Sequence, residues 1–260
     1  MNIQLDYYGA REIARKACLR AACFLGFGIN SARDGRLQDF SLSKVMNLQF
    51  LPPDLPASKV EEFKGEYEKW IVANGLRELI EGFAVFLDRL FEYSLIASQN
   101  GKTLDPDSLK RIQAVRNKGL PGKQHALRTD FAIQSELASH LKSIYEARNC
   151  MSHTRGIVTR NFTNDGDTLL VTWRAIEILL VRPSGEEQFL EFKQDAELVE
   201  GPGNLVRRSV TRERRFSLDQ PITFDGKDLA EVCLFGHMAC ESFFASALDF
   251  AKQNGVIPEN

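Results

Sequence analysis

The sequence predicts a mainly α-helical bundle with a small antiparallel β-meander inserted before the last helix. Apolar residues recur at helical spacing through much of residues 8–153. Residues 157–224 are instead rich in β-branched residues and interrupted by turn signals, which is typical of short strands. The final segment, residues 227–253, is apolar on nearly every side, so we expect it in the interior of the bundle.

The order of these segments predicts a single domain over residues 1–260. Its helical part covers residues 1–155 and 227–255, and its β-rich insertion covers residues 156–226. Because the final helix is too apolar to stand alone, it has to pack against the helices that precede the insertion. We therefore expect the insertion to belong to the same domain as the bundle.

The first helix is predicted over residues 8–24, where apolar and small residues follow helical spacing. Gly26 and Gly28 are expected to end it, and a polar loop then leads to the turn at Pro52-Pro53-Asp54.

A long helical stretch follows from Ser58 to Leu95, where Ser58 and Glu61 have the spacing of a capping box. Each glycine inside a helix is unfavourable by roughly 1 kcal/mol relative to alanine, so we expect kinks or a break. The glycines concerned are Gly65, Gly75 and Gly82.

Three shorter features precede the insertion. Asp105 and Pro106 are an N-cap and first-turn pair, which predicts a short helix to about Asn117. The run from Gly119 to Gly122 predicts a loop, and a further helix is expected over residues 130–153.

Three strands are predicted within the insertion. They are Thr168–Val181, Glu187–Phe192 and Leu205–Phe216, separated by turns rich in Gly and Pro.

Composition excludes several classes of protein. The 33 basic and 35 acidic residues give a net charge of -2. This balance gives no support for nucleic-acid binding over the whole surface, but it is compatible with a local basic surface. No apolar run approaches the roughly 20 residues that span a bilayer, so no membrane association is expected. The five cysteines form no CxxC pair and are expected to be reduced, mostly buried thiols of a cytoplasmic protein. No Cys/His spacing suggests a metal site or a cofactor.

The end of the helix over residues 130–153 carries a concentration of polar residues. On a helical wheel, Arg148 and Ser152 continue the stripe formed by apolar residues, while Asn149 and His153 flank it. The pairs Asn149 with His153 and Arg148 with Ser152 have i,i+4 spacing and can touch. The opposite side of the helix is expected to face solvent, with Glu136, Ser139, Lys142, Ser143 and Glu146.

The stretch Arg148-Asn149-Cys150-Met151-Ser152-His153, followed by Gly156-Ile157-Val158, resembles the signature of the HEPN superfamily (higher eukaryotes and prokaryotes nucleotide-binding). That signature is an Arg, four to six residues and a His, usually with a polar residue directly after the Arg. The resemblance implies a HEPN-like helical bundle that dimerises across the motif. It also implies a metal-independent endoribonuclease without a cofactor, of the kind found in bacterial toxin–antitoxin and phage-defence systems.

The residue types suit this chemistry. Cleavage without a metal needs proton transfer and positive charge beside the phosphorus that the 2′-hydroxyl attacks. His153 exchanges protons near neutral pH, Arg148 offers a permanently charged fork for phosphate oxygens, and Asn149 can orient the imidazole or hold the phosphate. Ser152 and Arg155 are further candidates for contacting the substrate. A homodimer would supply two motif histidines to one site. RNA and an antitoxin or other regulatory protein are the partners implied.

Arg207 and Arg208 are also candidates for binding RNA, because residues 205–216 carry five arginines and one glutamate. The competing interpretation is structural: residues 186–200 carry six acidic residues and one lysine, and a neighbouring strand of opposite charge would neutralise the arginines.

Two alternatives to catalysis remain open at the motif. Arg148 and His153 near the end of a helix interact favourably with its dipole, and Gly156 is an ordinary stop signal, so the motif can be purely structural. The protein can also be a non-catalytic HEPN-type module that binds a nucleotide or a partner protein through the same face.

Overall fold

The computed structural model describes residues 5–34, 55–99, 104–190 and 202–256. Within them the chain is mainly helical, with a small antiparallel sheet before the last helix, which confirms the predicted fold class at that level. The helices are α1 (Tyr7–Asp34), α2 (Ala57–Ser98), α3 (Pro106–Arg116), α4 (Leu120–Phe131), α5 (Ala138–Thr154) and α6 (Gly226–Gln253). The strands are β1 (Thr168–Val181), β2 (Glu187–Phe189) and β3 (Asn204–Ser217), and a 3-10 turn, η2, covers Arg160–Phe162.

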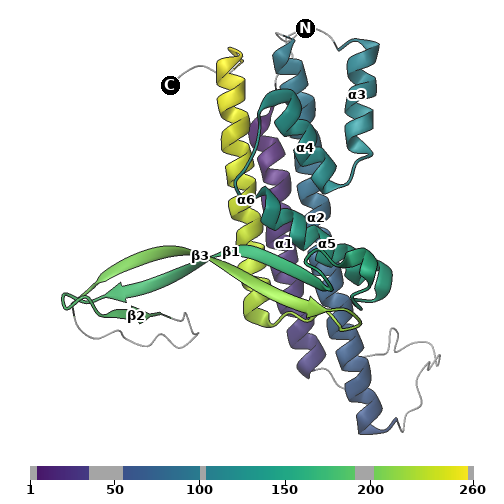
Figure 1. The fold of residues 1–260 in the computed structure, drawn as a ribbon, viewed down its shortest axis with the longest axis vertical. Helices are drawn as coiled ribbons and strands as arrows, with labels where there is room; N and C mark the ends of the chain where they lie inside the picture. Colours follow the sequence, from purple (N-terminus) through teal and green to yellow (C-terminus); the bar gives the residue numbers. More distant parts are fainter. Residues whose placement is uncertain (1–4, 35–54, 100–103, 191–201, 257–260) are drawn as a thin grey trace, which may run out of the picture.

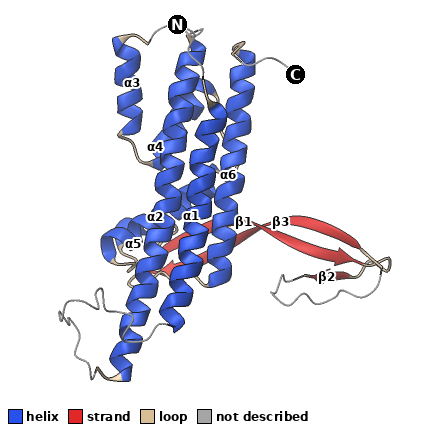
Figure 2. Cartoon of the chain, turned by 180° about the vertical axis from the view of Figure 1, so that it is seen from behind, coloured by secondary structure: helices blue, strands red, loops and turns tan. Residues whose placement is uncertain are grey.

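Helices α1, α2 and α6 lie side by side and form the main layer of the bundle (Figure 1). Helices α4 and α5 and the base of the sheet cover one face of this layer, whereas the view from behind shows α1 uncovered between α2 and α6 (Figure 2). The interior is aromatic, since Phe83 and Phe86 of α2 pack edge to face and Phe83 also meets Phe243 of α6. Helix α6 contacts α1, α2, α5 and β1, although its Leu234 is exposed.

The first helix is longer than predicted, because Gly26 and Gly28 do not end it. Gly28 is buried against Ile71 of α2, and a Cβ at that position would lie 2.6 Å from the Ile71 side chain. The glycine therefore allows two helices to approach closely, and α1 continues to Asp34. The predicted loop to Pro52-Pro53-Asp54 lies outside the described residues.

Helix α2 is continuous, so the predicted break at its glycines is wrong. Gly82 allows close packing, since a Cβ there would lie 2.1 Å from the Cβ of Ala17. The capping box at Ser58 and Glu61 is also absent, because the N-cap is Pro56 and no side chain caps the helix start.

The predicted loop from Gly119 to Gly122 is the beginning of α4. Gly119 is the N-cap, and Pro121 occupies the first turn, where a missing amide proton is harmless. The predicted helix over residues 130–153 starts only at Ala138, because α4 ends at Phe131 and Ala132 adopts a left-handed conformation. The short helix after Asp105 is confirmed, with the Asp105 carboxylate accepting a hydrogen bond from the amide of Ser108.

The sheet is not a meander, because its strand order is β2-β1-β3 and β1 is central. Strands β1 and β3 pair along their whole length, from Thr168 with Ser217 to Val181 with Asn204. Their far half extends away from the helices as an arm, and β2 joins β1 at its outer end (Figure 1). The base of the arm is fixed by Trp173, which is buried and donates a hydrogen bond to Glu231 of α6 at 2.9 Å. The predicted second strand ends earlier, at Phe189, and its last residues lie outside the described ranges.

No helix in the described ranges is both long enough and apolar enough to cross a membrane. The five cysteines are free thiols, and all except Cys23 are buried.

Candidate functional site

The motif lies at the end of α5, which is anchored firmly to the chain that follows it. Arg155 and Gly156 both have positive φ and end the helix. The Thr154 hydroxyl bonds to the carbonyls of Cys150 and Ile157, and the amide of Val158 donates to the carbonyl of Gln220. These bonds connect the end of α5 to the segment between β3 and α6 and give the motif residues fixed backbone positions.

Arg148 points toward α2 and is held there by two oxygens. Its Nη2 lies 2.8 Å from a carboxylate oxygen of Glu81, and its Nη1 donates a hydrogen bond to the side-chain oxygen of Asn149 at 2.9 Å. The Arg148 side chain is 18% exposed, whereas Glu81 is half exposed. The Nε of Arg148 is buried and has no hydrogen-bond partner among the described residues.

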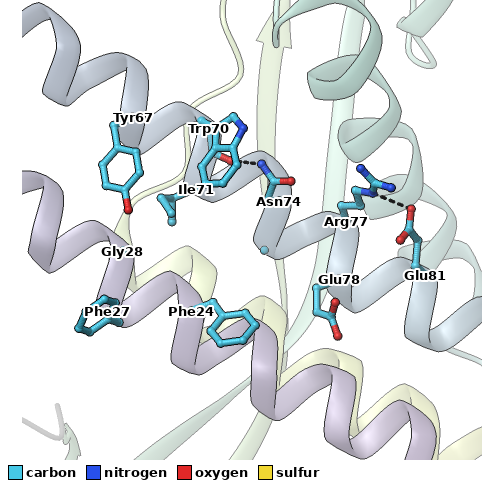
Figure 3. Close-up of a pocket in the computed structure, with 11 residues that line it drawn as sticks. Phe24, Phe27, Gly28, Tyr67, Trp70, Ile71, Asn74, Arg77, Glu78 and Glu81 are labelled. Atoms are coloured by element: carbon cyan, nitrogen blue, oxygen red, sulfur yellow. Dashed lines mark hydrogen bonds and ion pairs between the residues drawn. The ribbon is translucent and has the colours of Figure 1, made fainter. Parts of the chain in front are cut away.

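A second arginine shares the same carboxylate. Arg77, one turn before Glu81 on α2, donates to Glu81 Oε1 at 2.7 Å (Figure 3). Arg148 contacts the same oxygen. One half-exposed carboxylate therefore sits between two guanidinium groups. An anion that displaced this carboxylate would meet both cations.

His153 lies on another side of α5. It is exposed, and its ring stacks on Phe162 of η2 with 6.4 Å between ring centroids and 8° between ring planes. Residues on a helix turn by about 100° each, so His153 is directed about 140° away from Arg148. The imidazole is open to solvent, while the guanidinium is engaged with α2.

Two contacts suggested by i,i+4 spacing are therefore replaced by others. Asn149 bonds to Arg148 and not to His153, and Arg148 bonds to Glu81 and not to Ser152, among the described residues. Ser152 and Arg155 are exposed beside the motif, where a substrate can reach them. The wheel failed to include Glu81 because this partner comes from a helix 67 residues earlier in the chain.

The helical wheel predicted that the opposite side of α5 faces solvent, but part of that side is buried. Ser143 is buried, and its hydroxyl donates to the carbonyl of Thr172 in β1 while accepting from the Thr172 amide. His140 is also close to β1, with 2.7 Å between its Nδ1 and the Thr172 hydroxyl. Burial, followed by the charge of Arg174, lowers the pKa of His140 below the ordinary histidine value.

An open groove of about 440 Å³ adjoins Glu81 between α1 and α2 (Figure 3). Phe24 and Phe27 line it from α1, and Tyr67 and Trp70 line it from α2. Phe24, Phe27 and Trp70 are each more than half exposed. Sequence reasoning missed this groove, although aromatic pairs spaced three residues apart on two neighbouring helices were a usable signal.

Arg207 and Arg208 do not lie with the motif. They are in the outer half of β3, where Arg207 pairs with Ile178 of β1. Ile178 is six residues along β1 from Thr172, the residue that contacts α5. Arg207 is therefore about 20 Å along the arm from the contact with α5.

Most arginines of β3 pair with acidic residues, but mainly with acids outside residues 186–200, the segment expected to neutralise them. Arg208 pairs with Glu187 at 2.7 Å, in agreement with the expected strand, whereas Arg212, Arg214 and Arg215 pair elsewhere. Their partners are Glu177 and Glu231, Asp225 and Asp228, and Asp165 and Glu213, respectively. Most of residues 186–200 lies outside the described ranges.

In the described part of the chain, no three His, Cys, Asp or Glu side chains are grouped so that they could hold a metal ion. Comparison of the sequence with protein-family models and with curated proteins, and of the fold with solved structures, finds no match.

Proposed function

We propose that the protein is a HEPN-type, metal-independent endoribonuclease of a bacterial toxin–antitoxin or phage-defence system. The observation that carries this proposal is the end of α5, where an exposed imidazole and a guanidinium with a displaceable carboxylate partner lie within the last two turns of the helix. The motif resemblance supplies the reaction type.

In the proposed reaction, the 2′-hydroxyl of a nucleotide loses its proton and its oxygen attacks the adjacent phosphorus. The bond to the 5′-oxygen of the next nucleotide breaks, and that oxygen takes up a proton. The products are a 2′,3′-cyclic phosphate and a free 5′-hydroxyl. His153 transfers a proton, Arg148 stabilises the negative phosphorane, and Asn149 orients Arg148, to which it already bonds. Ser152 and Arg155 are placed to contact the flanking backbone.

Two copies of the chain are part of this proposal. Since His153 and Arg148 diverge by about 140°, one copy does not direct both groups toward the same phosphate. One copy also has a single motif histidine, whereas the reaction needs both a base and an acid. A symmetric dimer with the two ends of α5 facing each other would supply both. An antitoxin or other regulatory protein would act by covering this end of α5.

Incubation of the purified protein with total RNA in EDTA tests this function. We expect the wild type to cleave RNA and leave 2′,3′-cyclic phosphate ends, and Arg148→Ala and His153→Ala to leave it intact. His237→Ala, which removes a histidine of α6 in a pocket lined only by α1 and α6, serves as the control and should cleave normally. Cleavage that survives in His153→Ala would contradict the proposal.

The second candidate is a non-catalytic HEPN-type module that binds a nucleotide or a partner protein. The pairing of Arg148 with Glu81 and Asn149 favours it, because an arginine that is already held by two partners can be purely structural. This candidate predicts that folded wild-type protein leaves RNA intact but still binds nucleotide or a protein through the end of α5.

A further inference from the structure

A second groove, of about 530 Å³, lies between α4 and the start of α5. Three basic side chains line it: His125 and Arg128 from α4, and Lys142 from α5. The remaining polar residues around it are Gln124, Gln134, Ser135 and Ser139. No aspartate or glutamate is among the described residues that line the groove. In a chain whose net charge is -2, this groove concentrates positive charge without compensation at its walls.

The basic side chains of this groove are available to a ligand. Arg128 and His125 are exposed, and Arg128 makes no ion pair with any described residue. The Lys142 side chain is 56% exposed, and its ammonium reaches Glu146 only at 3.5 Å. Exposed pairs of this kind contribute little and are readily exchanged for another anion. Arg148, by contrast, is only 18% exposed.

The start of α5 adds a backbone donor to the same groove. Ala138 and Ser139 lie in the first turn of this 17-residue helix and line the groove. The Ala138 amide donates to the carbonyl of Ser135 at 3.2 Å, which leaves the Ser139 amide as the donor at the groove. Free amides at the beginning of a helix, together with its dipole, favour a negatively charged group. This donor and the three basic side chains favour the same kind of ligand, one that carries phosphate or a similar anion.

The groove lies on the same side of α5 as part of the motif. At about 100° per residue, Lys142, Asn149 and His153 fall within about 40° of one another. Lys142 and His153 are eleven residues apart, about 16 Å along the helix axis. Glu146 lies between them, and its carboxylate accepts a hydrogen bond from Asn164 at 2.7 Å. A chain of phosphates bound in the groove could reach His153 if it passes this carboxylate.

We propose that the groove between α4 and α5 binds the phosphate backbone of single-stranded RNA, a few nucleotides from the bond on which His153 acts. This inference rests on the proposed function, because it makes the groove an extension of the same substrate site. Arg128 presents a planar fork to phosphate oxygens, and Lys142 adds a compact charge. Gln134 and Ser139 offer neutral hydrogen bonds beside them.

Binding of a labelled 2′-O-methyl oligouridylate, measured by fluorescence anisotropy at several salt concentrations, tests the inference. This probe cannot be cleaved, so the result does not depend on catalysis. For Arg128→Ala/Lys142→Ala we expect weaker binding and a salt slope that falls by about 1.4, at roughly 0.7 for each phosphate that the variant no longer neutralises. Lys59→Ala/Lys110→Ala removes the same charge elsewhere, and Lys59 matches Lys142 in exposure, so its binding should equal that of the wild type. Glu146→Gln should bind more tightly.

The outcomes separate this inference from the proposed function. An unchanged affinity and salt slope in the groove variant would overturn the inference, even if the wild type cleaves RNA. The expected loss of binding, together with intact RNA in the cleavage assay, would support the groove while contradicting the nuclease. A parallel titration with inorganic phosphate separates the two sources of the anion. Groove-dependent binding of phosphate without binding of the oligonucleotide would overturn the assignment to RNA.

Discussion

The two stretches of α2 differ in what surrounds them. None of the residues from Ala57 to Ile71 is buried, whereas the stretch from Val72 to Ser98 contributes fourteen buried residues to the core. The open stretch presents Tyr67 and Trp70 to a groove. The packed stretch is covered by α4, α5 and α6. One continuous helix thus serves as both a core element and an exposed surface. Glu81 lies in the packed stretch, yet its carboxylate is half exposed where it contacts Arg148 of α5.

Two cation–carboxylate pairs on α2 sharpen this difference. Asp88 and Glu81 are seven residues apart, so they lie on nearly the same side of the helix. Asp88 binds Lys123 of α4, and the lysine side chain is only 5% exposed. Glu81 binds Arg148 of α5 and is half exposed. The first pair is expected to hold the fold together and the second to be exchangeable.

The largest expected effect follows from removing the buried cation. Lys123 bonds to Asp88 and to the carbonyls of Val115 and Arg116, so Lys123→Met leaves the partly buried Asp88 carboxylate and two carbonyls without this partner. We expect the free energy of unfolding in urea to fall by about 3–5 kcal/mol. Lys118→Met, at an exposed neighbouring position, should change it by less than about 0.5 kcal/mol. Equal effects of the two changes would show that the buried pair is not structural.

Substitution of one glycine in each stretch of α2 compares the packed stretch with the open one. A Cβ at Gly82 would meet Ala17, so Gly82→Ala should lower the free energy of unfolding by about 1–3 kcal/mol. Gly65 has nothing within 4 Å of such a Cβ, so Gly65→Ala should raise stability by up to about 1 kcal/mol through its better helix propensity. Urea denaturation of both variants checks the prediction, which fails if the two changes have the same sign.

The exposed pair should contribute far less than the buried pair. Glu81→Gln removes the charge that holds Arg148 and Arg77, and we expect a loss of stability below about 1 kcal/mol. Urea denaturation of this variant beside Lys123→Met compares the two pairs. A loss as large as that of Lys123→Met would mean that Arg148 is a structural residue, which would favour the non-catalytic candidate.

The smallest expected effect is a pH dependence at the contact between α5 and β1. Burial lowers the pKa of His140 in the folded protein, whereas the unfolded chain has the ordinary value of about 6.5. The unfolded state therefore binds more protons as the pH falls below about 6.5, and stability decreases there. His140→Gln should reduce this decrease between pH 7.5 and pH 5, as measured by the midpoint of urea unfolding. An identical pH profile in the variant would contradict the assignment to His140.

Local signals in the sequence predicted much of the fold. The β-branched residues between turn signals predicted β1 with its bounds, Thr168–Val181, and Asp105 with Pro106 predicted the start of α3. The wrong predictions concern glycine and distant partners. Gly28 and Gly82 are packing sites, and their role depends on the neighbouring helix, which a single sequence does not reveal. The predicted meander would place β2 between β1 and β3. In the structure β1 is central and pairs with both other strands, a choice of neighbours that the single sequence does not reveal.

The candidate site was predictable in its residues but not in its contacts. The helical wheel placed Arg148 on the inward side of α5, and the side chain is indeed mostly buried. Its partner Glu81 belongs to another helix and carries no motif that links it to Arg148. The groove between α4 and α5 was missed because Gly119-Leu120-Pro121-Gly122 indicated a loop, so His125 and Arg128 were not placed on a helix that faces α5.

The most direct test of the central claim is RNA cleavage in EDTA by wild-type protein mixed with His153→Ala protein, with subunits exchanged by refolding the mixture. If each site needs both copies, only dimers of two wild-type chains are active, and an equal mixture retains about a quarter of the activity of the same total amount of wild type. Independent sites in each chain would instead retain about half, which would contradict the shared site. The absence of cleavage by folded wild-type protein alone would contradict the nuclease itself.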